Sequence, residues 1–383
     1  MRKVYLMTPG PTPIPPEVLL TQAEPMVHHR TPQYTAIFVD VVEGLKRIFL
    51  TGNDVITLAA SGTGGMEAAV ANCFSPGERV LVCAGGKFGE RFGEICKAYS
   101  IQAEFYQYDW DRAADPAEIK KRLTADPGIK GVFLTHSETS TGVVNDVQAV
   151  GKVVAETPAI LVVDSISGAG ALEMRTDDWL VDVLVAGSQK ALMTPPGLAA
   201  VAVSPKAWEL IEQSTSPRYY FDLMRARKKY ADKSPQTPFT PAISLVKGML
   251  AAIKLIEAEG LERVWERHRR MALSTRAAVR AMGLELYARD LERAYAVTAV
   301  KAPASIDGAE IVRVLNRKHG VIVAGGQGDL KGKIFRIGHV GYYDIHDLLV
   351  AIGALEMTLA ELGHTFERGT GVAALERTYM EFG

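Results

Sequence analysis

The sequence predicts an α/β protein with a large domain on a mainly parallel sheet, followed by a smaller α+β domain. Short apolar runs without polar alternation recur through the first two thirds of the chain, and helical patterns separate them. Such runs are typical of parallel strands buried on both faces. Glycine or polar residues follow each run directly, as expected at the functional edge of a parallel sheet. At 383 residues the chain is too long for one small core.

Five strands and three helices of the large domain can be assigned in chain order. Each strand is an apolar run rich in β-branched residues, and each helix shows apolar residues at helical spacing. The predicted strands are 54–60, 79–86, 131–136, 159–164 and 181–187, and the predicted helices are 66–74, 88–98 and 146–156.

The rest of the chain is less regular at first and then helical. The prolines at 217, 235, 238 and 241 and a basic run interrupt 205–245, whereas 244–282 is one long helical pattern that Gly260 breaks or kinks. The small domain is predicted to contain strands 284–288, 294–300, 321–326 and 334–340 and helices 308–319 and 344–362. The tail after Gly363 is predicted as a terminal arm. We expect a large domain over 17–250 and a small domain formed by 1–16 and 251–383.

Composition narrows the class of protein. The net charge of −1 provides no bulk positive field, so we expect neither nucleic-acid nor membrane binding. No apolar run approaches the roughly 20 residues that span a bilayer, and prolines interrupt the short apolar start. Three cysteines without a C-x-x-C pair suit a reducing compartment. These features predict a cytoplasmic protein.

Polar residues gather where the predicted strands end. They are Ser61–Gly65, Gly85–Gly89, His136–Thr139, Asp164–Ser165 and Ser188–Lys190. The first group opens a helix, where backbone amides and the hydroxyl of Thr63 can bind phosphate; a glycine-rich turn with an N-cap remains the alternative. Neither a Walker loop nor a dinucleotide fingerprint is present, because the lysine and third-glycine positions do not match.

Lys190 ends an apolar run, which is an unusual place for a lysine. A desolvated lysine can form a Schiff base, and pyridoxal phosphate (PLP) needs such a lysine, an acid and a phosphate cradle. Lys190, Asp164 and the helix start at Thr63, Gly64 and Gly65 could supply all three. A solvated lysine and a turn-capping aspartate remain alternatives, and core packing is the alternative for Phe88 as a flat face for the ring.

Seven motifs, in order, carry a family resemblance. The sequence TPGPTPIPPEV, HHRTPQY, ASGTGGMEAA, THSETSTG, VVDSISGAG, GSQKAL with TPPG, and FRIGHVG resembles class V aminotransferases of PLP fold type I. Within that family it is similar to the alanine:glyoxylate, serine:glyoxylate and serine:pyruvate group, across roughly residues 5–362. The resemblance implies a seven-stranded, mainly parallel sheet, PLP as cofactor and transfer of an amino group from alanine or serine to glyoxylate or pyruvate.

The resemblance also implies a role for each cofactor-binding residue. Lys190 would hold PLP as a Schiff base and carry the proton between the substrate and the cofactor. Asp164 would pair with the pyridinium nitrogen, Phe88 would stack on the ring, and Thr139 would bond its phenolic oxygen. The residues expected to hold the phosphate are Thr63, Gly64, Gly65 and Gln189.

Substrate contacts and a partner subunit are implied in the same way. Arg336 would bind the substrate carboxylate in a bidentate manner, with Gly10 beside it. Thr240 would reach the phosphate in the neighbouring subunit of a homodimer, whereas Thr237 stands where relatives often have a tyrosine. No metal is expected.

Four other functions can be considered for this sequence. Cysteine desulfurase needs a late nucleophilic cysteine, but all three cysteines precede residue 97 and are predicted to lie in the core. A nicotinamide dehydrogenase lacks support because the glycine fingerprint is broken. A non-catalytic PLP-fold binding protein would not need Lys190, Asp164 and Arg336 together. A phosphoserine or aminophosphonate transaminase stays open, because an anionic substrate group could bind at 28–30 (His-His-Arg), although a surface turn explains these residues equally well.

Overall fold

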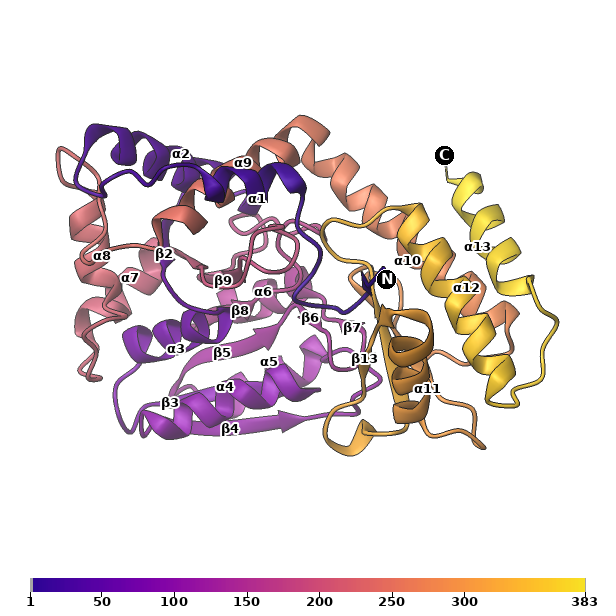
Figure 1. Cartoon of the computed structure of the whole chain (residues 1–383). Helices are drawn as coiled ribbons and strands as arrows, with labels where there is room; N and C mark the ends of the chain where they lie inside the picture. The colour runs from indigo at the N-terminus through magenta and orange to yellow at the C-terminus, as the bar shows by residue number, and fades with distance from the viewer. Residues whose placement is uncertain (1–2, 383) are drawn as a thin grey trace.

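A seven-stranded sheet forms the centre of the computed structural model, which describes residues 3–382 (Figure 1). The strand order is β2-β10-β9-β8-β5-β3-β4; β10 is antiparallel to both neighbours and the other pairs are parallel. The predicted mainly parallel sheet is therefore confirmed. The strands are β2 (Asp54–Leu58), β3 (Arg79–Ala84), β4 (Gln102–Gln107), β5 (Ile129–Thr135), β8 (Ile160–Asp164), β9 (Val183–Gly187) and β10 (Ala199–Val203).

Helices cover both faces of this sheet, so the central strands are apolar over most of their length. Every residue of β8 is buried: Leu161 and Val163 pack into one core cluster, and Ile160 and Val162 pack into the other. The first cluster contains α2 (Pro32–Phe49), α5 (Pro116–Ala125), α6 (Val147–Ala155) and α9 (Ile243–Glu259). The second contains α3 (Gly62–Cys73), α4 (Lys87–Ala98), α7 (Pro205–Gln213) and α8 (Leu223–Tyr230).

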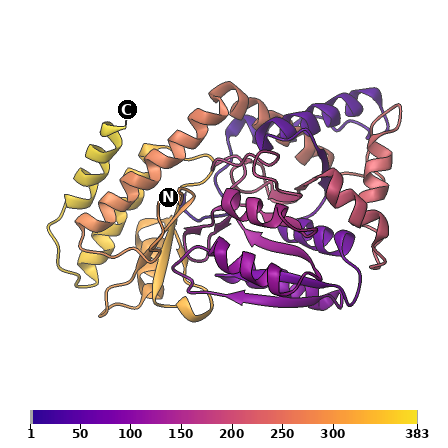
Figure 2. The same ribbon diagram turned by 180° about the vertical axis from the view of Figure 1, so that it is seen from behind.

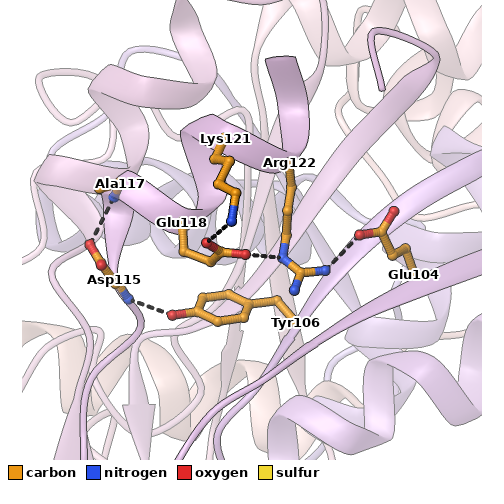
Figure 3. A network of polar contacts seen from close by, with 7 residues as sticks. All are labelled: Glu104, Tyr106, Asp115, Ala117, Glu118, Lys121 and Arg122. Atoms are coloured by element: carbon orange, nitrogen blue, oxygen red, sulfur yellow. Dashed lines mark hydrogen bonds and ion pairs between the residues drawn. The ribbon is translucent and has the colours of Figure 1, made fainter. Parts of the chain in front are cut away.

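The edge strand β4 and helix α5 were not predicted, because surface polar residues hide their apolar pattern. Four of the six β4 residues are exposed. Figure 3 shows how the two elements are joined: Arg122 on α5 donates to Glu104 of β4 at 2.7 Å and to Glu118 at 3.0 Å. The hydroxyl of Tyr106 accepts from the amide of Asp115, the residue that caps α5. Charged side chains of this kind also protect an edge strand from pairing with another chain.

The prediction of irregular structure over 205–245 is partly wrong. Helices α7 and α8 lie there, and each begins at a side-chain cap: Ser204 accepts from Ala207 and Asp222 accepts from Arg225. Pro205 is the first residue of α7, a position that tolerates proline, and the other prolines of the segment fall outside both helices and mark the connections.

The small domain has its own core around an antiparallel sheet. Its order is β11-β14-β13, formed by Val297–Lys301, Ile334–Gly338 and Ala324–Gly325. The predicted strand 284–288 is wrong: it contributes only an isolated bridge, between Leu286 and Val300. The helices are α10 (Leu261–Ala281), α11 (Gly308–Val314) with a π-helical extension (Leu315–His319), a short 3₁₀ turn (Gly328–Leu330), α12 (Ile345–Glu361) and α13 (Thr370–Glu381).

Two predicted features of the small domain take a definite form. Gly260 separates α9 from α10 with φ of 88°, so the long pattern is two helices. The tail is not an extended arm, because α13 packs against α10 and α12 at the end of the molecule away from α8 (Figures 1 and 2). The domain boundaries at 16/17 and 250/251 stay a prediction.

The start of the chain crosses from the small domain to the sheet edge. Strand β1 (Tyr5–Leu6) pairs in parallel with β12 (Val321–Ile322). Further along, the amide of Thr12 donates to the carbonyl of Gln189 at 3.2 Å. The remaining short elements are α1 (Pro16–Ala23), β6 (Ser137–Glu138) and β7 (Val143–Val144). Among the residues the structure describes, no helix has the length and apolar character needed to cross a bilayer.

Candidate active site

A cavity of about 260 Å³ lies at the carboxyl ends of β5, β8 and β9. This is the edge where ligands bind in open parallel sheets. Six of the predicted site residues line it, namely Gly10, Thr63, Phe88, Asp164, Gln189 and Lys190. The sheet topology therefore gathers residues from five separate segments of the chain into one site.

Lys190 follows β9 and is only 8% exposed. Its Nζ donates to the carbonyl of Pro9 at 2.7 Å. Burial lowers the pKa of the amine to about 8; the charges of Arg336 and Arg91 act in the same direction, and Asp164 opposes them. A side chain on Gly10 would put its Cβ 2.3 Å from Lys190 Cε, so only glycine leaves room for the amine. With a pKa of about 8, a useful fraction of Lys190 is in the unprotonated, nucleophilic form near neutral pH.

Asp164 ends β8 and is buried beside the same cavity. Its Oδ1 accepts from the amide of Ile166 at 2.9 Å, and it forms no ion pair with any described residue. Burial raises the pKa of the carboxyl to about 7, and the nearby Glu138 raises it further, while the Ile166 amide and Lys190 act to lower it. A buried carboxyl with spare hydrogen-bonding capacity suits a cationic ring nitrogen.

Helix α3 starts at the cavity with Ser61 as its N-cap. The amides of Gly64 and Gly65 donate to Ser61 O, so Gly62 and Thr63 carry the first free amides of the helix. A Cβ on Gly65 would lie 2.8 Å from Val185 of β9, which explains this glycine by close packing of helix on sheet. The phosphate roles predicted for Gly64 and Gly65 stay predictions.

Gln189 gives an independent sign that a polar group belongs in the cavity. Its side-chain oxygen is buried and has no hydrogen-bond partner in the described chain. A buried polar atom without a partner is costly, and a bound group with hydrogen-bonding atoms would satisfy it. Together with Lys190, Asp164 and the start of α3, Gln189 makes the cavity fit PLP.

Phe88 lies in the first turn of α4, where Glu138 fixes it; the sequence placed Glu138 among the polar residues after the third strand but gave it no role. Glu138 accepts from the amides of Phe88 and Gly89 at 2.9 and 3.1 Å, and its other oxygen accepts from Ser140. A carboxylate at a helix N-terminus is favoured by the helix dipole. Burial nevertheless raises the pKa of Glu138. No local pattern signals this role, because Glu138 and Phe88 are brought together only by the fold.

Arg91 also lines the cavity, and sequence reasoning gave it no role. Its guanidinium lies 4.7 Å from the ring centroid of Phe88 and donates to the hydroxyl of Thr63 at 3.2 Å. The available signal was its spacing: residues three apart on a helix share a face, and Phe88 had been singled out.

Arg336 lies next to the cavity on β14 of the small domain and is 4% exposed. It donates to Thr139 O at 2.7 Å and to Gly325 O at 2.6 and 2.9 Å, and it forms no ion pair with a carboxylate of the described chain. Burial lowers the pKa of the guanidinium to about 10. An uncompensated buried guanidinium is suited to an anionic ligand. Thr139, on the loop after β6, meets this arginine through its carbonyl.

The other predicted positions lie elsewhere in this chain. Thr240 is exposed and lines a separate pocket together with Thr237. Arg30 donates to Gln236 at 2.6 Å and to the carbonyl of Thr237 at 3.0 Å, so it holds this loop and does not enter the cavity. An anionic substrate group at 28–30 therefore finds no support within one subunit.

The three cysteines are all buried in the core, as predicted. Burial raises the pKa of each thiol, to about 12 for Cys83 and Cys96. None lines the cavity. A thiol with a raised pKa is a poor nucleophile, which agrees with setting desulfurase chemistry aside.

Comparison with known proteins gives the family. A family model described as "Aminotransferase class-V" matches residues 4–330. The chain is 44% identical over 379 residues to a protein of Synechococcus named soluble hydrogenase, small subunit, with 98% of each chain covered. It is 38% identical over 382 residues to L-aspartate–glyoxylate aminotransferase of Paracoccus denitrificans, covering 98% of this chain and 96% of the relative.

Solved structures agree in fold. Pyridoxamine–pyruvate aminotransferase from Mesorhizobium loti superposes with a TM-score of 0.94 at 30% identity, over 100% of this chain and 98% of that one. The match covers both the large sheet and the small domain. This chain is therefore a member of the class-V aminotransferase family, and its cofactor is pyridoxal phosphate.

Proposed function

We propose that this aminotransferase moves the amino group of a small amino acid, alanine or serine, to glyoxylate or pyruvate. The observation that supports it most is one buried amine, Lys190, whose lowered pKa and neighbour Asp164 share a single cavity. Serine–glyoxylate and aspartate–glyoxylate aminotransferases among the relatives support glyoxylate as the acceptor.

Lys190 has two tasks in this proposal. It would hold the cofactor, and it would carry the proton from the substrate Cα to the cofactor carbon that receives it. When bound, pyridoxal phosphate supplies an aldehyde that reacts with amines and a ring that accepts the electron pair left by the departing proton. A pKa of about 8 lets Lys190 serve as base and acid near neutral pH.

Asp164 and Phe88 control the ring. The Asp164 carboxylate would keep the ring nitrogen protonated, which favours electron withdrawal from Cα. Phe88 would hold the ring from one face, and Glu138 fixes Phe88 through the start of α4. Because both substrates use the same cavity in turn, the reaction is ping-pong.

Arg336 would hold the substrate carboxylate, with Gly10 beside it. The free donor capacity of a buried guanidinium supports this role. We expect Arg336→Gln to raise KM for both substrates by about tenfold or more, as loss of a charge-assisted hydrogen bond implies. Affinity for the cofactor should stay nearly unchanged; an equal loss of cofactor would overturn this assignment.

The decisive test is chemical trapping. Borohydride reduction of the yellow holoenzyme, followed by peptide mapping, is expected to find the cofactor on the peptide that contains Lys190. A donor panel of alanine, serine and aspartate against glyoxylate and pyruvate, read as spectral half-reactions, then identifies the substrates. An adduct on another lysine, or none, would contradict the proposal.

The name of the Synechococcus relative raises a hydrogenase role for comparison. Among residues 3–382, no group of three or more His, Cys, Asp or Glu side chains is placed to hold a metal ion. The amine and carboxyl of the cavity instead favour amino transfer. Assay of the purified chain for both activities separates the two.

We also propose a cytoplasmic homodimer with shared sites. Three buried, unpaired cysteines suit a reducing compartment. Next to Thr240, Tyr219 and Tyr220 are 69% and 47% exposed and both pack on Phe239. An exposed aromatic group of this kind favours an interface, and a second copy would bring Thr240 to the neighbouring cavity. Sedimentation is expected to give twice the chain mass; an active monomer would contradict this.

A further inference from the structure

The cavity contains a cation that the proposed mechanism does not use. Among the described residues that line it, Lys190 and Arg91 carry the positive side chains. Lys190 is committed to the cofactor aldehyde and to proton transfer. The proposed phosphate ligands Thr63, Gly64, Gly65, Gln189 and Thr240 are all uncharged. A phosphate of nearly two negative charges thus leaves Arg91 as the lining cation available to balance it.

Arg91 is joined to this end of the cavity by a direct contact. Its Nη1 donates to Thr63 Oγ1 at 3.2 Å, across from α4 to the start of α3. By filling a lone pair of that hydroxyl, the guanidinium leaves the Thr63 O–H free to donate elsewhere. Thr63 is thereby set as a donor beside the free amides of Gly62 and Thr63, where an anion is favoured.

No carboxylate of the described chain neutralises the charge of Arg91. The guanidinium forms no ion pair with any carboxylate in residues 3–382, and besides Thr63 it contacts the face of the Phe88 ring, 4.7 Å from the ring centroid. That contact fixes the side chain without neutralising it. Its charge is also felt at Lys190, whose pKa it helps to lower, so Arg91 lies close to the reacting groups.

We propose that Arg91 is the cationic ligand of the cofactor phosphate and sets the Thr63 hydroxyl as a donor to it. The proposal deepens the proposed function, because it rests on Lys190 and Thr63 belonging to one cofactor site. It assigns to α4 a part of the phosphate site that none of the other proposed ligands supplies.

The test compares two forms of the cofactor. The apoenzyme and its Arg91→Gln variant are titrated with pyridoxal phosphate and, separately, with pyridoxal, which lacks the phosphate; binding is followed by absorbance. Arg91→Gln is expected to weaken pyridoxal phosphate by about tenfold to a hundredfold, the loss of one charge-assisted hydrogen bond. Affinity for pyridoxal should change by less than about threefold, because the contact that the variant loses is with the phosphate, which pyridoxal lacks.

Two further variants calibrate the result. Lys97→Gln removes a positive charge from the exposed face of the same helix and should leave both affinities unchanged. Arg91→Lys keeps the charge but lacks the planar fork, so it should fall between wild type and Arg91→Gln, and it preserves the test if the glutamine variant folds poorly. Circular dichroism of each apoenzyme checks the fold.

The outcomes separate this inference from the proposed function. Equal weakening of pyridoxal phosphate and pyridoxal, or no weakening of either, overturns the role of Arg91. A raised KM for aspartate with an unchanged ratio of cofactor affinities would instead assign Arg91 to a substrate side chain and also overturns it. Failure to trap the cofactor on Lys190 in the wild-type enzyme would sink the proposed function itself.

Discussion

Two carboxylates are buried at opposite ends of the same pair of strands, and they differ in what surrounds them. Asp164 ends β8 and lines the cavity, whereas Asp182 precedes β9 at the other end of the sheet. Burial raises the pKa of both. Asp182 accepts from Leu161 N at 2.9 Å and from Ser204 Oγ at 2.8 Å, one donor for each oxygen. Within the part of the chain that the structure describes, Asp164 accepts from one donor, the amide of Ile166.

The lysines at the two ends repeat the contrast. Lys206, near Asp182, donates to Ala159 O at 2.5 Å and to Thr157 O at 3.3 Å. Lys190 has one acceptor, the carbonyl of Pro9. Lys206 is only partly buried, so the two lysines differ in burial as well as in hydrogen bonding. The two carboxylates are both buried, and spare hydrogen-bonding capacity beside a cavity is what separates Asp164 from Asp182.

The largest effect is expected from the two lysines. Lys190→Ala should reduce transamination by at least about a thousandfold, because both the anchor and the proton carrier are lost. Lys206→Ala should stay within about twofold of wild type, since its contacts join strand and helix far from the cavity. Steady-state rates with alanine or serine and glyoxylate check both; retained turnover in Lys190→Ala would break the comparison.

Substitution of the two carboxylates should affect kcat to different extents. Asp164→Asn is expected to lower kcat by about a hundredfold to a thousandfold, because the ring nitrogen loses its anionic partner. Asp182→Asn should change kcat by less than about threefold in protein that remains folded. Pre-steady-state half-reactions measure the two chemical steps separately, and equal losses in both variants would refute the assignment.

The unfolding free energy of the apoenzyme should depend on pH, because ionising the buried Asp164 carboxyl is unfavourable. Its pKa of about 7 exceeds the ordinary 3.8, so the native state keeps a proton that the unfolded chain releases. Stability should therefore fall as pH rises from about 4 to 7 and level off above that. Asp164→Asn should remove this dependence and exceed wild type by about 1–4 kcal/mol at pH 8. Urea unfolding of both proteins across this pH range is the measurement. A stability difference between wild type and Asp164→Asn that does not change with pH would contradict the prediction.

The smallest effect is expected at the structural end. Ser204→Ala removes one of the two donors to Asp182 and the side-chain cap of α7, which should cost about 1–2 kcal/mol of unfolding free energy. Activity should be unchanged at temperatures where the variant is folded. A loss of kcat without loss of stability would show that the two ends are coupled.

Much of the site was accessible from the sequence because its residues follow strands. Apolar runs locate the strands, and parallel strands share a carboxyl edge, so Asp164, Lys190 and the start of α3 could be expected to meet. Arg91 and Glu138 were missed because their functions depend on contacts between elements: Arg91 reaches from α4 to Thr63, and Glu138 reaches back to α4.

The fold could be predicted where burial dominates and not where it is partial. Edge strand β4 alternates with surface polar residues, and β10 is made of small residues that favour no single structure, so neither stood out. The strand expected over 284–288 has the right composition but meets only one bridge partner. Composition describes what a segment can pair with, whereas the neighbouring segments decide whether it does.

The N-terminal segment 5–10 runs from β12 to Lys190, and this arrangement has a consequence for biosynthesis. Residues 5 and 6 leave the ribosome long before Val321 and Ile322, the strand they pair with, and the loop that follows them carries Pro9 and Gly10 to the amine. A nascent chain can assemble its central sheet early, but this long-range closure must wait for the small domain. Chains stalled before that point would expose an incomplete cavity. Retention of vitamin B6 by a nascent chain would therefore indicate that translation has passed the small-domain strands.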